Sequence, residues 1–145
     1  MKAQYFCAYH TERLRACESD SFRHWTEMMR RGVQAYSECR FEAANLYLGA
    51  ALDIGLLRHC CEENGLFTTL HIMKPAEFLL EMQLLDQRHD AAEDMLDRIS
   101  AITRPDKDWL ISQLMNFLAE GYARVGLEGK CPAMQPVNIT AVSMH

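Results

Sequence analysis

The amino-acid sequence predicts an all-α fold, and two observations support that prediction. The chain of 145 residues contains only seven glycines and four prolines, whereas an all-β domain needs turn residues about every ten positions. Its nine methionines and many leucines and alanines favour helices. With 49% apolar and 24% charged residues, the composition is that of a folded domain that can bury a core.

The first predicted helical pair covers residues 21–63. Apolar and small residues at i, i+4, i+7 and i+11 predict a helix that runs to about Ser37, after potential capping residues at positions 19–21. The second helix is predicted to begin at Phe41 and to end before the Asn-Gly pair at 64–65. Because this second helix is apolar almost all round, we expect it to be central, with neighbours on at least two sides.

A second helical pair is predicted over residues 75–103, and a further helix over 106–126 is expected to cap the domain. Residues 66–73 lack helical periodicity and are predicted to form an ordered apolar linker. After this linker, Pro75 is predicted to be the first helical residue, where its missing N–H costs nothing. Asp90 is predicted to cap the following helix.

The chain is expected to form a single helical domain over residues 1–129, since its length lies within the usual range for one domain. Residues 1–18 have room for a leading helix. Residues 130–145 contain two prolines and are expected to be an extended or loose tail.

The net charge of −5 is spread unevenly, with +2 over residues 1–40, −6 over 41–104 and −1 over 105–145. Nucleic-acid binding requires a concentrated positive field, so we expect no nucleic-acid partner. Residues 1–10 lack the apolar run of a secretory signal, and no apolar stretch is long enough to cross a bilayer. The sequence therefore predicts a cytoplasmic protein without a membrane partner, whose six cysteines are reduced thiols.

A cluster of arginines with Trp25 and Tyr36 could form a small basic and aromatic patch. Glu27, however, lies four residues from both Arg23 and Arg31. We therefore expect ordinary ion pairs along the surface of this helix.

One pattern of large and small residues occurs twice in the chain. Its first copy is Phe41, Ala44, Leu48 and Ala51, and its second copy, 48 residues later, is His89, Ala92, Leu96 and Ile99. The pattern resembles the tetratricopeptide repeat, a helix–turn–helix unit of about 34 residues, over residues 25–58 and 73–106. The chain departs from the repeat where Cys39 replaces its usual glycine, and where residues 59–72 are inserted between the two units.

The resemblance implies antiparallel helical hairpins stacked as a short solenoid, with a C-terminal capping helix. Small residues, Gly32 among them, would let the paired helices approach closely. Tetratricopeptide stacks bind peptides or partner proteins on the inward faces of their first helices. The positions that match those faces here are Met29, Val33, Tyr36, Glu77, Glu81, Leu84, Ile111, Met115 and Leu118.

This surface would be an apolar, methionine-rich groove with an acidic rim. Methionine adapts its shape to varied apolar partners, so the expected ligand is an amphipathic or extended apolar segment flanked by Lys or Arg. The function that the resemblance implies is that of a protein-binding adapter or chaperone.

A different class of function is a small helical enzyme or a metal- or thiol-linked sensor. Its candidate residues are His59, Cys60 and Cys61, the carboxylates Glu77 and Glu81, and the carboxylates Asp90, Asp94 and Asp97. Successive helical residues point about 100° apart, so the His-Cys-Cys run cannot converge on one metal ion. The carboxylates form stripes that are expected to face solvent, so we predict no catalytic residue, metal or cofactor. A third alternative is a self-associating structural protein, whose apolar faces form a homodimer.

Overall fold

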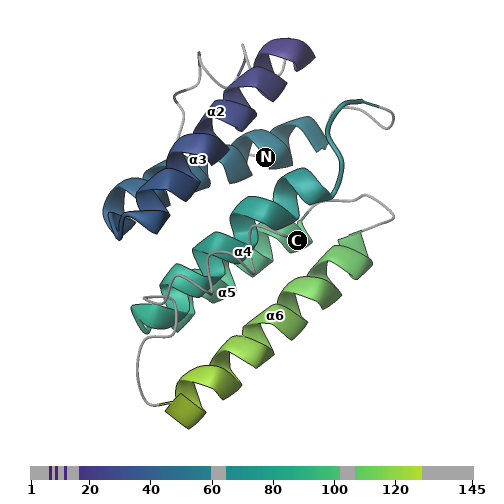
Figure 1. Cartoon of the computed structure of the whole chain (residues 1–145). Coiled ribbons are helices and arrows are strands. Elements are labelled where there is room, and N and C mark those ends of the chain that lie inside the picture. The colour runs from purple at the N-terminus through teal and green to yellow at the C-terminus, as the bar shows by residue number, and fades with distance from the viewer. Residues whose placement is uncertain are drawn as a thin grey trace. The chain divides into compact units, whose positions relative to one another are not determined.

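The computed structural model of the chain describes residues 7, 9, 12, 17–59, 65–101 and 107–128. Every regular element within these ranges is a helix, which confirms the all-α prediction for this part of the chain. The elements are α2 (Glu18–Ser37), α3 (Phe41–His59), α4 (Leu70–Leu85), α5 (His89–Ser100) and α6 (Lys107–Glu128) (Figure 1). The expected tail and most of the expected leading helix lie outside the described residues, although Tyr9 and Glu12 are helical.

The contacts divide the chain into two compact units, Met1–Pro75 and Ala76–His145. The boundary falls inside α4. The first unit therefore contains α2, α3 and the beginning of α4, and the second contains the remainder of α4 together with α5 and α6.

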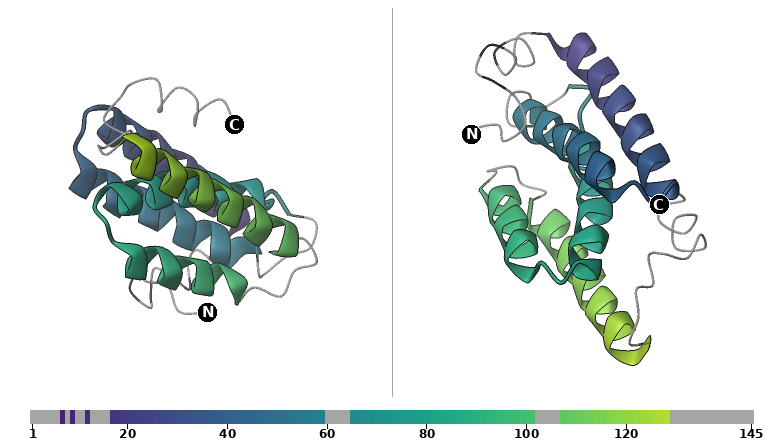
Figure 2. Two further views of the ribbon diagram at one scale, coloured as in Figure 1. Left: turned by 90° about the horizontal axis from the view of Figure 1, so that it is seen from below. Right: turned by 90° about the vertical axis from the view of Figure 1, so that its left-hand side faces the viewer.

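In the first unit, α3 is the central helix, because every residue from 48 to 59 is buried. α2 runs antiparallel to it, as Figure 2 shows from two further sides. A Cβ atom added to Gly32 of α2 would lie only 2.6 Å from Leu48 Cγ of α3. This close approach and the central place of α3 were both predicted, and both are confirmed. The expected continuation of α3 to about residue 63 lies outside the described ranges.

The turn between α2 and α3 is a Schellman motif, which satisfies the last carbonyl groups of a helix. The Arg40 N–H donates to the Ala35 carbonyl at 2.8 Å, and the Cys39 N–H donates to the Tyr36 carbonyl at 3.0 Å. Cys39 has a φ of 60°, in the left-handed region that favours glycine. The tetratricopeptide pattern has its glycine at this position.

The turn between α4 and α5 has the same geometry, 48 residues further on. The Arg88 N–H donates to the Gln83 carbonyl at 2.8 Å, the Gln87 N–H donates to the Leu84 carbonyl at 3.2 Å, and the φ of Gln87 is 55°. The offset of this turn from the one at Cys39 equals the offset of the repeated sequence pattern. The two predicted hairpin turns are therefore equivalent in backbone conformation.

The predicted N-terminal caps are wrong at both α2 and α5. α2 begins at Glu18, after Cys17, and Ser21 lies in its first turn, where its hydroxyl donates to the Cys17 carbonyl at 2.8 Å. α5 begins at His89 and has no side-chain cap, so Asp90 is its second residue. Carboxylates in these first turns act through the helix dipole, which favours negative charge there without a capping hydrogen bond.

The predicted linker over residues 66–73 is also wrong in its second half. α4 begins at Leu70, and Pro75 lies inside it. A proline has no N–H to donate to the carbonyl four residues earlier, which here belongs to His71. That carbonyl accepts the indole N–H of Trp25 instead, at 3.0 Å, so a contact from α2 replaces the missing helical hydrogen bond.

In the second unit, α6 has one stripe of buried leucines, and α5 packs against α6. The stripe consists of Leu110, Leu114 and Leu118. α4 is apolar on more than one side and is extensively covered, so the expectation that Glu81 faces solvent is wrong: Glu81 is only 2% exposed. No helix within the described ranges has the length and apolar character needed to cross a membrane.

Candidate functional site

The nine residues predicted to line a groove differ greatly in exposure. Four are buried, namely Tyr36, Glu81, Leu84 and Leu118. Four are half-buried, namely Met29, Val33, Glu77 and Ile111. The ninth, Met115, is 49% exposed.

In the first unit, Met29 and Val33 lie one turn apart on α2, beside the stripe that packs on α3. Tyr36 has no exposed surface, and its ring meets the Phe41 ring edge-on with centroids 5.6 Å apart. Tyr36 therefore holds the hairpin together, while Met29 and Val33 keep part of their surface exposed.

In the second unit, Ile111 and Met115 lie one turn apart on α6, on one flank of its buried leucine stripe. Leu118 belongs to that stripe, and Leu84 of α4 approaches Gly121 of α6. The available apolar surface at these positions is therefore formed by Ile111 and Met115.

An aromatic cluster in the first unit joins α2 to the beginning of α4. The His71 ring lies edge-on to Trp25 and Phe22 and is tilted against Phe67, with centroid distances of 4.6, 5.3 and 5.2 Å. Phe67 also contacts Ile54 of α3. The sequence analysis did not predict this cluster, because its members are up to 49 residues apart. The one local signal was Pro75, which indicates an unusual start of the helix that contains His71.

The backbone of His71 also contacts α3 closely. A Cβ atom added to Gly55 would lie 2.6 Å from the His71 carbonyl oxygen. This is the oxygen that accepts the Trp25 indole N–H. The absence of a side chain at Gly55 thus leaves room for the hydrogen bond that compensates for Pro75.

The His71 side chain caps the beginning of its own helix. Its Nδ1 accepts the Thr68 backbone N–H at 3.0 Å, and the Thr68 hydroxyl lies 3.2 Å from the same atom. The arrangement is similar to a capping box, with histidine in the place of the usual Glu or Gln. Because Nδ1 accepts a hydrogen bond, the ring is neutral with its proton on Nε2. Burial of the ring lowers the pKa of His71 below its ordinary value of 6.5.

Glu18 makes a second link between distant parts of the first unit. Its carboxylate pairs with Arg58 of α3 at 3.2 Å and accepts the Leu66 backbone N–H at 2.9 Å. The Arg58 side chain is 2% exposed. Since a buried guanidinium needs an opposite charge, Glu18 compensates for its burial and also fixes the start of the segment before α4.

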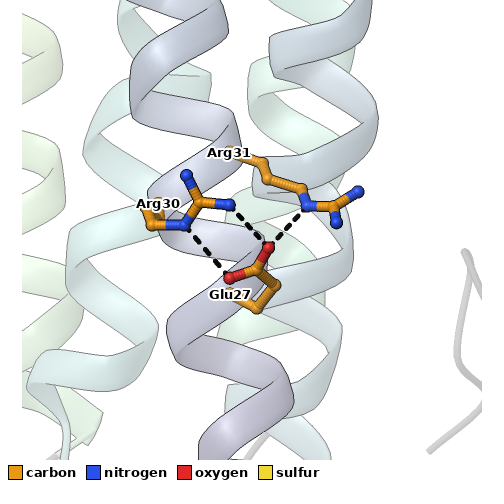
Figure 3. A network of polar contacts seen from close by, with 3 residues as sticks. All are labelled: Glu27, Arg30 and Arg31. Atoms are coloured by element: carbon orange, nitrogen blue, oxygen red, sulfur yellow. Dashed lines mark hydrogen bonds and ion pairs between the residues drawn. The ribbon is translucent and has the colours of Figure 1, made fainter.

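The arginines of α2 form the surface ion pairs that were predicted (Figure 3). Glu27 accepts hydrogen bonds from Arg30 and Arg31, each at 2.7 Å to Oε1, and these bonds lower the pKa of Glu27 to about 2. Arg23 pairs with Asp20 at 2.6 Å instead of Glu27. Three arginines and two carboxylates of this face are thus paired within α2, and Arg31 also lies over the Tyr47 ring.

The candidate metal and acid–base residues that the structure describes differ in their surroundings. His59 is buried, and its Nε2 lies 3.4 Å from the Thr69 hydroxyl, whereas Cys60 and Cys61 lie outside the described residues. Among the residues whose positions are described, no three His, Cys, Asp or Glu side chains are placed to hold a metal ion. The carboxylates at positions 90, 94 and 97 face solvent as predicted.

No protein-family model matches the chain, and no curated protein or solved structure is significantly similar to it. The likeness to tetratricopeptide repeats therefore depends on the sequence pattern.

Proposed function

We propose that the chain is a protein-binding adapter or chaperone built from tetratricopeptide-like helical hairpins. The observation that carries the proposal is the pair Ile111 and Met115, which leaves apolar surface on the flank of α6 beside a fully buried stripe. Met29 and Val33 provide a second such pair on α2. Contiguous apolar patches mark surfaces that a partner covers, and in the proposal each pair belongs to such a patch.

The repeat character of the fold supports the same class of protein. Two turns with one hydrogen-bond pattern lie 48 residues apart, and Gly32 lets α2 and α3 approach closely, as paired repeat helices do. In the proposal, the two hairpins stack as a short solenoid and α6 caps it. Repeat proteins commonly use such stacks for extended binding surfaces.

The chemistry of the surface indicates the class of partner. Methionine side chains accommodate apolar groups of different shape. The exposed face of α5 carries four carboxylates, at positions 90, 93, 94 and 97. We therefore propose a partner segment with apolar anchors flanked by Lys or Arg, bound in the cytosol, where the sequence predicts that the protein resides.

The test is co-purification of a tagged chain from its native host, with variants that place a charge on each apolar pair. We expect Met29→Glu and Met115→Glu to lose a partner that the parent chain retains. Gln34→Glu and Gln113→Glu introduce the same charge at exposed positions of the same two helices and should retain that partner. Unchanged far-ultraviolet circular dichroism establishes that the helices persist in all four variants.

Two results would contradict the proposal. One is retention of the partner by both methionine variants, and the other is a preparation whose sole binding partner is a second copy of the chain. Sedimentation at two concentrations separates that second case, a homodimer, from a monomer with a bound partner.

A further inference from the structure

The outer face of α6 carries no charge over about three helical turns. This outer face lies opposite the buried leucine stripe and consists of the exposed residues Trp109, Ser112, Asn116 and Ala119. The chain contains no Asp, Glu, Lys or Arg between Trp109 and Ala119. A helix at a protein surface normally carries charged residues on this side. The outer face of α6 can therefore be buried without removing a charge from water.

Two other helices show what an exposed helical face usually carries in this chain. α5 has four carboxylates on its exposed face, and α2 has the ion-paired residues Arg23, Glu27, Arg30 and Arg31. Burying any of these charges would be costly, so those faces are suited to water. Of these three helices, α6 alone has an exposed face that another surface can cover without that cost.

Trp109 is the largest side chain of the outer face. It is 49% exposed, whereas Ser112 and Ala119 on the same face are small. Tryptophan is enriched among the residues that contribute most to the affinity of protein interfaces. The outer face thus presents both a protruding ring and small residues over which such a ring can pack.

The spacing of the four residues fits the packing of one helix along another. They follow at i, i+3, i+7 and i+10, which is the spacing of the contact seam between paired helices. We propose that α6 pairs antiparallel with α6 of a second copy of the chain, through the outer face, and so forms a two-fold symmetric dimer. Such an interface uses the same face on both copies, so the face must be complementary to itself.

An antiparallel register centred on residue 114 gives that complementarity. It places Trp109 opposite Ala119 of the second copy, because positions 109 and 119 are equally far from 114. Ser112 is then opposite Asn116 of the second copy, where the hydroxyl and the amide can form a hydrogen bond. Two-fold symmetry makes each contact twice. A parallel pair would place Trp109 against itself and Ala119 against itself, so one end would be overpacked and the other left with a gap.

The charge of the chain favours a second copy, and not a basic segment, as the occupant of the outer face. With a net charge of −5, two copies repel each other wherever their carboxylates meet, and an uncharged face avoids that repulsion. A segment rich in Lys or Arg finds no carboxylate on this face. The dimer is independent of the partner proposed above, because Ile111 and Met115 lie on a flank of α6, outside the outer face.

The experiment is sedimentation velocity of the purified full chain, with no other protein present, between about 2 and 200 μM. We expect the weight-average sedimentation coefficient to rise with concentration from that of a monomer to that of a dimer. The rise should persist at higher salt, because screening weakens the repulsion between the copies. A monomer at every concentration would overturn the proposal and leave the outer face to a different protein or to another segment of this chain.

Two variants locate the interface. Ala119→Glu places a carboxylate against Trp109 of the second copy without an opposite charge, so we expect the dissociation constant of the dimer to rise more than about tenfold. Gln34→Glu adds the same charge at an exposed position of α2 and should leave the constant unchanged. Circular dichroism verifies that both variants keep their helices. Equal dimerisation of Ala119→Glu and the parent chain would overturn the proposal.

Discussion

At the scale of single residues, Gly55 shows most clearly how the first unit depends on close backbone contact. Gly55→Ala places a Cβ atom 2.6 Å from the His71 carbonyl oxygen and 3.1 Å from its carbon, both of them backbone atoms of another helix. Overpacking of this kind costs roughly 1–3 kcal/mol, against a gain of up to about 1 kcal/mol in helix propensity. We expect a net loss of about 1–2 kcal/mol in the free energy of unfolding, measured by urea denaturation.

Gly121→Ala is the matched control for that substitution. Its new methyl group would meet Leu84 Cδ1, the far end of a flexible side chain that can rotate away. We expect the free energy of unfolding to change by less than about 1 kcal/mol, because the gain in helix propensity offsets the displacement. Equal losses in the two variants would contradict the special role of the His71 carbonyl.

A second residue-scale prediction compares two carboxylates of α2 that each bind a guanidinium. Glu18→Gln removes a carboxylate that pairs with the buried Arg58 at 3.2 Å, so we expect a loss on the order of 2 kcal/mol in the free energy of unfolding. Glu27→Gln breaks two ion pairs on the exposed face of α2, where water screens the charges, and should change stability little. Denaturation of both variants at pH 7 measures the difference, and a larger loss in Glu27→Gln would contradict it.

At the scale of helices and turns, the two Schellman motifs predict stabilising substitutions. Cys39 and Gln87 hold left-handed backbone conformations, which cost a residue with a side chain about 1–2 kcal/mol. Glycine removes that cost but adds about 0.5–1 kcal/mol of unfolded-state entropy. We expect Cys39→Gly and Gln87→Gly each to raise the free energy of unfolding by roughly 0.5–1 kcal/mol.

Ser37→Gly provides the control for these turns. Ser37 is exposed in the last turn of α2, where glycine has no strain to relieve. Thermal denaturation should show a higher midpoint for Cys39→Gly and a lower one for Ser37→Gly. Destabilisation by glycine at both Cys39 and Gln87 would contradict the account of these two turns.

Much of the helical organisation could be predicted from local sequence, because periodicity and turn position are local properties. The hairpin turns and the central place of α3 are confirmed in this way. The start of α4 could not be predicted, because the group that permits Pro75 inside the helix is the indole of Trp25, far away in the chain. The burial of Glu81 could not be predicted for a similar reason, because it depends on which residues cover α4.

At the scale of the whole molecule, the candidate binding site was less predictable than the fold. A helical pattern identifies which side chains share a face, but it does not reveal how far a neighbouring element covers that face. Tyr36, Leu84 and Leu118 lie in the core, and the two pairs Met29–Val33 and Ile111–Met115 retain accessible surface. The proposed function therefore relies on these two pairs.

The most direct test of that function is site-specific photo-cross-linking in the native host, with a photoreactive phenylalanine analogue at one position of the chain. The proposal predicts one cross-linked protein from Met29 and from Met115, and none of it from the exposed control positions Arg23 and Gln113. Mass spectrometry of the products identifies the partner and its apolar segment. Identical products from all four positions, or cross-links from Met29 and Met115 to a second copy of this chain alone, would contradict the account.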